Sequence, residues 1–231
     1  MSLNSFTLSQ VQTELNSFIA RVYAWMFLGL LTTAVVAMTV AATPALANAI
    51  IGNPILFFAL LIAELAAVGV LAVLVRKMSP ELATLVFIGY AALNGVTFSI
   101  IFLTFTATSI ATTFFVTAGT FGAMSVYGYV TQRDLTSLGN LLLMGLIGII
   151  IASVVNIFLA NSIIYWIVTF VGILIFVGLT AYDTQKIKNM NRVVNVATGE
   201  GQKAAILGAL ALYLDFINLF LLLLRFTGQR D

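Results

Sequence analysis

Three acidic residues lie within long apolar stretches of this sequence, and their carboxyl groups are the side chains best placed to do chemistry. They are Glu64, Asp183 and Asp215. Asp215 is the most deeply placed, because apolar, small or amide residues surround it from Ala204 to Leu224. A charged side chain at the centre of a membrane-spanning helix costs roughly 2.5 to 3.5 kcal/mol on insertion scales. Such a group therefore turns inward, finds a partner and is a candidate functional residue.

Asp183 and Asp215 stand on successive apolar stretches, which makes them a candidate pair. Two carboxylates in contact cannot easily both ionise, so they would share one proton and titrate together. Loss of the shared proton would create repulsion and open the contact, which is a pH switch without histidine. Two alternatives stay open, and one observation argues against the pairing. Asp183 could simply balance Lys186 at the membrane surface, and Asp215 could be a packing residue bonded to serine, threonine or asparagine. The expected span limits also put Asp215 deeper in the membrane than Asp183.

Glu64 and three further polar residues in or beside the apolar stretches receive less weight. Glu64 is either a third acid on an ion pathway or a neutral, hydrogen-bonded carboxyl group. Arg76 is either an ion-pair latch for Asp183 or a basic orientation signal at a helix end. Asn94 and Asn218 either line a polar seam or form interhelical hydrogen bonds.

The chain contains neither histidine nor cysteine, which limits its chemistry. The lack of histidine excludes a Ser-His-Asp triad and an HExxH zinc site. The lack of cysteine excludes a thiol nucleophile and a thiolate metal site. Any proton chemistry must therefore rest on carboxylates, lysine or tyrosine. We expect no enzymatic activity and no resident cofactor. The net charge of +2 is too small to indicate a nucleic-acid partner.

The composition and the spacing of charges predict an all-α integral membrane protein. Of the 231 residues, 61% are hydrophobic and only 8% are charged, against roughly 25% in soluble domains. Three uncharged runs contain 42, 51 and 48 residues. As helix, each run is about twice as long as the ~30 Å hydrocarbon core requires, so each is a helical hairpin. We predict seven spans, at 22–42, 55–75, 82–103, 110–130, 138–159, 163–183 and 204–224.

Basic residues fall on alternate connections between the predicted spans, which sets the expected orientation. Eight of them lie on one side, namely Arg21, Arg76, Lys77, Arg133, Lys186, Lys188, Arg192 and Lys203. We therefore expect the N-terminus in the cytoplasm and the C-terminus on the other side. Residues 1–20 are expected to form a cytoplasmic tail, and residues 21–231 a single transmembrane domain.

Two motifs resemble the signature of the transmembrane Bax inhibitor motif family, also called the Bax inhibitor-1 family. The first is residues 181–185, AYDTQ, and the second is residues 212–220, LYLDFINLF. The segments 90–95, YAALNG, and 132–135, QRDL, are similar to the bacterial branch of the family. The resemblance extends from about Arg21 to Arg225, and it places the protein in a bacterial inner membrane.

The resemblance implies a fold and a function. The last helix is expected at the centre, enclosed by the other six, and the function implied is a pH-sensitive calcium leak controlled by Asp183 and Asp215. Ca²⁺ prefers six to eight oxygen ligands, so we expect only transient binding near the two aspartates, which suits conduction. The expected partners are the lipid bilayer, Ca²⁺ and H⁺, and the protein is expected to be a monomer or a weak oligomer.

Three other functions remain open on the sequence. A proton-coupled transporter could use Asp215 as its relay. A membrane interaction protein without transport could carry the acids as structural groups. An aspartyl intramembrane protease is the least favoured, because that class expects glycines before its second acid, where this chain has Tyr213 and Leu214.

Overall fold

The computed structural model describes residues 3–190 and 198–229, without the side chains of residues 3–15 and of Arg76. Every element of the described chain is a helix. The helices form two compact units. Unit 1 comprises Met1–Thr104 and Ile187–Tyr213, and unit 2 comprises Phe105–Lys186 and Leu214–Asp231.

All three prolines of the chain are the first residue of a helix. They begin α2 (Pro44–Ile51), α3 (Pro54–Leu74) and α4 (Pro80–Thr104). Proline suits this position because its fixed φ fits the helix and its missing N–H would be unpaired there in any case. The Asn53 side chain completes the start of α3 by accepting a hydrogen bond of 3.2 Å from the Leu56 backbone N–H.

Seven of the described helices are long and apolar enough to cross a membrane. They are Asn16–Ala41 of α1 (Leu3–Ala41), α3, α4, α5 (Ala107–Val130), α6 (Thr136–Leu159), α7 (Ser162–Met190) and α8 (Gly199–Thr227).

 The spans with the fewest buried side chains are α3 and α6, and they leave large apolar side chains such as Phe58 and Phe158 exposed at 63% and 83%. Such surfaces are stable in lipid and not in water. The prediction of an all-α integral membrane protein with seven spans is therefore confirmed.

Several helices are longer than the sequence predicted, because polar residues at the ends of the apolar stretches continue them. Helix α7 runs on to Met190, seven residues beyond the predicted end, and α8 begins at Gly199 rather than at 204. The backbone of the predicted tail, residues 1–20, is helical from Leu3, and the first hairpin turn contains α2. Arg192 lies outside the described residues. The central last helix, the orientation of the termini and the single domain of residues 21–231 stay predictions.

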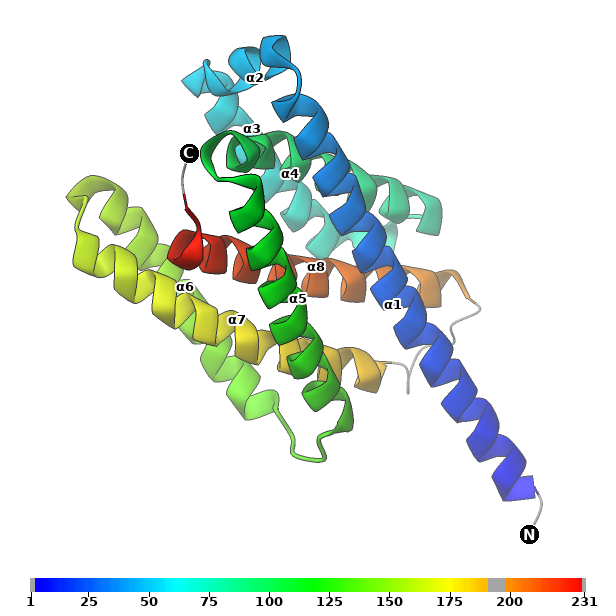
Figure 1. The fold of residues 1–231 in the computed structure, drawn as a ribbon. Coiled ribbons are helices and arrows are strands. Elements are labelled where there is room, and N and C mark those ends of the chain that lie inside the picture. The colour runs from blue at the N-terminus through cyan, green and yellow to red at the C-terminus, as the bar shows by residue number, and fades with distance from the viewer. Residues whose placement is uncertain (1–2, 191–197, 230–231) are drawn as a thin grey trace. The chain divides into compact units, whose positions relative to one another are not determined.

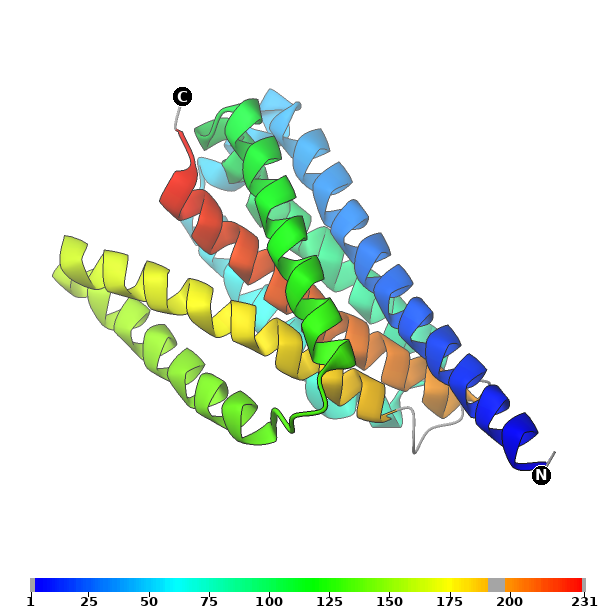
Figure 2. The same ribbon diagram turned by 60° about the horizontal axis from the view of Figure 1, so that its bottom comes forward.

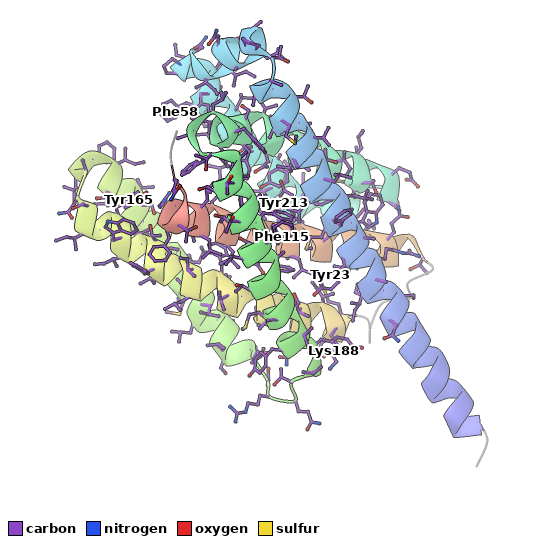
Figure 3. The ribbon with its side chains drawn as sticks, in the orientation of Figure 1. Tyr23, Phe58, Phe115, Tyr165, Lys188 and Tyr213 are labelled. Carbon is purple, nitrogen blue, oxygen red and sulfur yellow. The ribbon has the colours of Figure 1, made fainter. Side chains whose placement is uncertain are left out.

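In unit 1, α1 packs along α4, as Figures 1 and 2 both show. Glycines permit the contact: Gly95 of α4 lies against the Thr33 backbone carbonyl, with room for no Cβ atom. The first part of α8 contributes Tyr213, which is labelled in Figure 3. Its hydroxyl lies 2.7 Å from Thr33 Oγ1, and its ring contacts the ring of Phe87 edge to face, with centroids 6.0 Å apart.

In unit 2, α6 and α7 form an antiparallel hairpin (Figure 2). Its apolar core joins both helices to the second part of α8. The core comprises Ile175, Phe176, Leu179, Leu219 and Leu222, with Leu142, Leu146 and Ile149 packed against it.

Near its C-terminal end, α8 is held within unit 2 by several contacts. The Arg225 guanidinium lies 4.9 Å from the ring centroid of Tyr165, which is labelled near the start of α7 in Figure 3. The hydroxyl oxygens of Thr113 and Thr227 are 3.1 Å apart, and the Gln229 backbone N–H donates to Ser109 Oγ at 2.9 Å.

We predict that Ala160→Gly stabilises the protein. Ala160 follows α6 and has a left-handed backbone with φ of 48°. A side chain is unfavourable in that conformation, so its removal should raise the free energy of unfolding by about 1 kcal/mol. The measurement is the thermal unfolding midpoint in detergent. Ala111→Gly in the regular part of α5 is the control and should lower the midpoint; equal shifts for both variants would contradict the prediction.

Candidate functional site

The segment around Asp183 is fixed by two glycines on neighbouring helices of unit 2. Gly128 of α5 lies against the backbone carbonyl of Ala181, and Gly139 of α6 lies against the ring of Tyr182. A Cβ atom at either glycine would overlap these groups. The missing side chains therefore bring α5 and α6 close to α7 immediately before Asp183.

Asp183 and Asp215 both lie in unit 2, and their carboxyl groups are close enough to interact electrostatically. Asp215 is 4% exposed, and Asp183 is partly buried. A hydrogen bond between two carboxyl groups requires a proton on one of them, because an ionised carboxylate has no hydrogen to donate. The depth difference expected from the sequence does not keep the two residues apart, since α7 continues past Asp183 to Met190.

A lysine beside the two aspartates and an unpartnered oxygen of Asp215 are further features of this site. Lys186 lies one helical turn after Asp183, interacts with it electrostatically, and places its ammonium 5.8 Å from the ring centroid of Tyr182. Asp215 Oδ2 is buried and has no hydrogen-bond partner among the described residues. Asp215 therefore keeps one buried carboxyl oxygen to which no described residue forms a hydrogen bond.

Gln185 ties α7 to the loop between α5 and α6. Its side-chain Oε1 accepts from the Leu135 backbone N–H at 2.9 Å, and its Nε2 donates to the Arg133 carbonyl at 2.8 Å. Both ends of the amide are therefore used on one loop. Gln185 belongs to the AYDTQ motif, but the sequence alone does not tell which backbone groups this side chain meets.

The second part of α8 is aligned with α5 by aromatic contacts. The Phe216 ring lies between Phe114 and Phe121 of α5, with centroid distances of 5.6 and 5.4 Å. These edge-on contacts set the rotation of α8 at the residue after Asp215. Because Asp215 directly precedes Phe216 on α8, the same contacts restrict the direction of the Asp215 side chain.

The lower-weight residues of the sequence analysis lie elsewhere or bond locally. In unit 1, Thr97 donates to Glu64 Oε1 at 2.6 Å, which joins α4 to α3. Asn94 and Asn218 each donate from Nδ2 to a backbone carbonyl of their own helix, at 3.0 and 2.7 Å. The side chain of Arg76 lies outside the described residues, so the latch stays a prediction, as do the roles of the other three.

The aspartate pair can contribute four oxygen atoms to a cation. Ca²⁺ takes six to eight oxygen ligands, so water or backbone carbonyls would have to supply the rest. Such a site would bind Ca²⁺ weakly when both carboxyl groups are ionised. While one proton is shared, the pair carries a single negative charge and attracts a cation less strongly.

Comparisons with known proteins extend over nearly the whole chain. A family model described as "Inhibitor of apoptosis-promoting Bax1" matches residues 15–231. Inner membrane protein YbhL of Escherichia coli is 50% identical over 227 residues, which is 98% of this chain and 97% of that protein. A protein of Borreliella burgdorferi is 45% identical over 215 residues, 93% of each chain. A membrane protein of Streptococcus pyogenes is 36% identical over 225 residues, 96% of this chain and 97% of that one.

The name of the Escherichia coli relative agrees with the localisation predicted from the sequence. That protein is called an inner membrane protein, and seven helices of the described chain are suited to span a bilayer. The prediction of an integral inner-membrane protein is therefore confirmed.

We predict that Gly128→Ala destabilises unit 2, whereas Gly119→Ala on the same helix does not. The added methyl group at residue 128 meets the Ala181 carbonyl, while a Cβ atom at residue 119 meets no atom within 4 Å. Overpacking should lower the free energy of unfolding by about 1 to 3 kcal/mol. Thermal unfolding in detergent measures both variants. Because both substitutions add the same helix propensity, equal midpoints would show that the close approach has no energetic weight.

Gln185→Leu should release the loop between α5 and α6. The substitution leaves the Leu135 N–H and the Arg133 carbonyl without their partner, at a cost of about 1 to 3 kcal/mol. Amide hydrogen exchange of residues 131–135, measured by mass spectrometry, should accelerate about 5- to 150-fold. The control is Gln132→Leu, which changes an exposed glutamine of the same loop and should leave exchange at Leu135 unaltered. Unchanged exchange in Gln185→Leu would refute the restraint.

Proposed function

The chain belongs to the Bax inhibitor-1 family, and on that premise we propose that it is a pH-sensitive calcium leak channel of the bacterial inner membrane. Asp183 and Asp215 are the proposed gate. The observation that carries the proposal is the interaction between these two carboxyl groups within unit 2. A proton shared between them would tie α7, seven residues before its end, to the middle of α8.

The proposed gate works through the charge of the pair. With one proton shared, the two carboxyl groups attract each other and hold α7 against α8. As pH rises, the proton leaves, and two negative charges in an apolar surrounding repel each other strongly. The same step creates two carboxylates that attract a divalent cation. Deprotonation therefore opens the contact and provides the ligands in a single event.

The ion would move down its gradient and would bind only in passing. The pair supplies too few oxygens for tight Ca²⁺ binding, and weak binding allows an ion to leave as readily as it enters. The proposal includes no catalytic step and no resident cofactor. Its partners are the bilayer, Ca²⁺ and H⁺, and the active form is a monomer or a weak oligomer.

Calcium flux into liposomes that contain the purified protein tests the proposal. In the wild type, flux should rise from mildly acidic to mildly alkaline pH, by no more than about tenfold per pH unit because one proton is released. Asp183→Asn and Asp215→Asn should each remove most of this pH dependence, since an amide keeps a donor at every pH. A flux that is independent of pH in the wild type would refute the gate.

Asp134→Asn is the matched control for these variants. Asp134 lies in the loop between α5 and α6, and hydrogen bonds from the side chain and the backbone N–H of Thr136 hold the pKa of its carboxyl group below its ordinary value. The group is therefore ionised throughout the assay range, and its neutralisation should leave the pH dependence unchanged. The asparagine retains an oxygen that can accept from the Thr136 N–H.

The other functions considered from the sequence would give different results. A proton-coupled transporter would acidify the liposomes only when its substrate is present. An interaction protein would retain its cellular role when both aspartates are replaced by asparagine. An intramembrane protease would cleave a membrane-embedded peptide, and Asp215→Asn would abolish the cleavage.

A further inference from the structure

The buried face of α5 carries a serine hydroxyl whose role the two aspartates do not explain. Five residues spaced by three or four form this face, namely Thr113, Thr117, Phe121, Ser125 and Gly128. The hydroxyl groups of Thr113 and Thr117 are hydrogen-bonded, to Thr227 Oγ1 and to the Thr113 carbonyl. Ser125 Oγ is buried and has no hydrogen-bond partner among the described residues.

The neighbours of Ser125 on this face place it beside the aspartate pair. One turn before it, Phe121 contacts Phe216, the residue after Asp215. One turn after it, Gly128 lies against Ala181, two residues before Asp183. Ser125 therefore lies on α5 between the two points at which this helix meets the α7 and α8 segments that carry the aspartates.

Two buried oxygens in this region have no hydrogen-bond partner among the described residues, and both belong to side chains more than nine-tenths buried. They are Ser125 Oγ, on a residue 7% exposed, and Asp215 Oδ2, on a residue 4% exposed. A buried polar group without a hydrogen bond costs about 1 to 3 kcal/mol by mutational data, and most such groups are paired with protein or ordered water. Since Phe121 and Phe216 bring α5 and α8 into contact near both residues, a ligand shared by the two oxygens would satisfy both.

We propose that one buried water molecule bridges Ser125 Oγ and Asp215 Oδ2. Water fits because it can donate one hydrogen bond to the carboxyl oxygen, and it can also donate a second one to the serine hydroxyl or accept one from it. A calcium ion does not fit these two atoms alone, because it requires six to eight oxygens. The water would link α5 to the pair that already joins α7 and α8. This inference uses the aspartate pair but does not depend on calcium conduction.

Infrared spectroscopy of the full-length protein in lipid tests the proposal without any flux measurement. An internal water gives an O–H stretching band that shifts when H₂¹⁶O is replaced by H₂¹⁸O. We expect such a band in the wild type, and we expect its loss in Ser125→Ala and in Asp215→Asn. Thr117→Ala is the matched control, because it removes a buried hydroxyl from the same face of α5 that bonds to its own helix. The band should persist in that variant.

Each other result would overturn the bridging water. Absence of the band in the wild type, its persistence in Ser125→Ala, or its equal loss in Thr117→Ala would each do so. If Ser125→Ala shifted the carboxyl C=O band while no ¹⁸O-sensitive band existed, Ser125 would bond directly to Asp215. Thermal unfolding of each variant shows that the fold is retained. Since no calcium is present in the measurement, a failed leak assay would leave this result unaffected.

Discussion

The main physical constraint in unit 2 is the burial of one acid beside a second acid. Asp215 is almost completely buried, so water cannot stabilise its charge. Asp183, which interacts with it, could form a hydrogen bond with it only if one of the two carboxyl groups were protonated. Desolvation would normally make two acids in one site unfavourable. If both carboxyl groups were ionised, their charges would repel each other in this apolar surrounding, and the charge of Lys186, which interacts with Asp183, would oppose that repulsion.

Small residues make this contact possible. Gly128 and Gly139 bring two helices against the segment that leads to Asp183, and Gln185 then holds the adjoining loop by both ends of its amide. In lipid, helices gain no hydrophobic energy from association, so close packing and hydrogen bonds must hold them together. The contacts around Asp183 are of these two kinds. They hold the segment of α7 that carries Asp183 against α5, α6 and the loop between them.

The spans could be predicted from charge positions, but the helix ends and several contacts could not. Long uncharged runs identify hairpins because lipid excludes charge. The same criterion ended α7 at Asp183, although polar residues such as Gln185 are good helix formers and continue the helix to Met190. Ser125 gave no signal, because one serine among many hydroxyl residues of apolar helices becomes distinctive only when its neighbours are known to be paired. The hydrogen bonds of Asn94 and Asn218 to carbonyls of their own helices could not be predicted either, since the spacing of residues does not show where a side-chain amide points.

The contacts at the C-terminal end of α8 have a mechanical consequence for unit 2. Arg225 over Tyr165, together with the bonds of Thr227 and Gln229, fastens that end of the helix. Asp215 lies ten residues before Arg225, a lever arm of about 15 Å at 1.5 Å per residue. If the fastened end serves as a fulcrum, a tilt of about 10° displaces Asp215 by roughly 2.5 Å, more than a hydrogen bond tolerates. A small swing of a rigid rod is then enough to part the two acids, without unwinding any turn of helix.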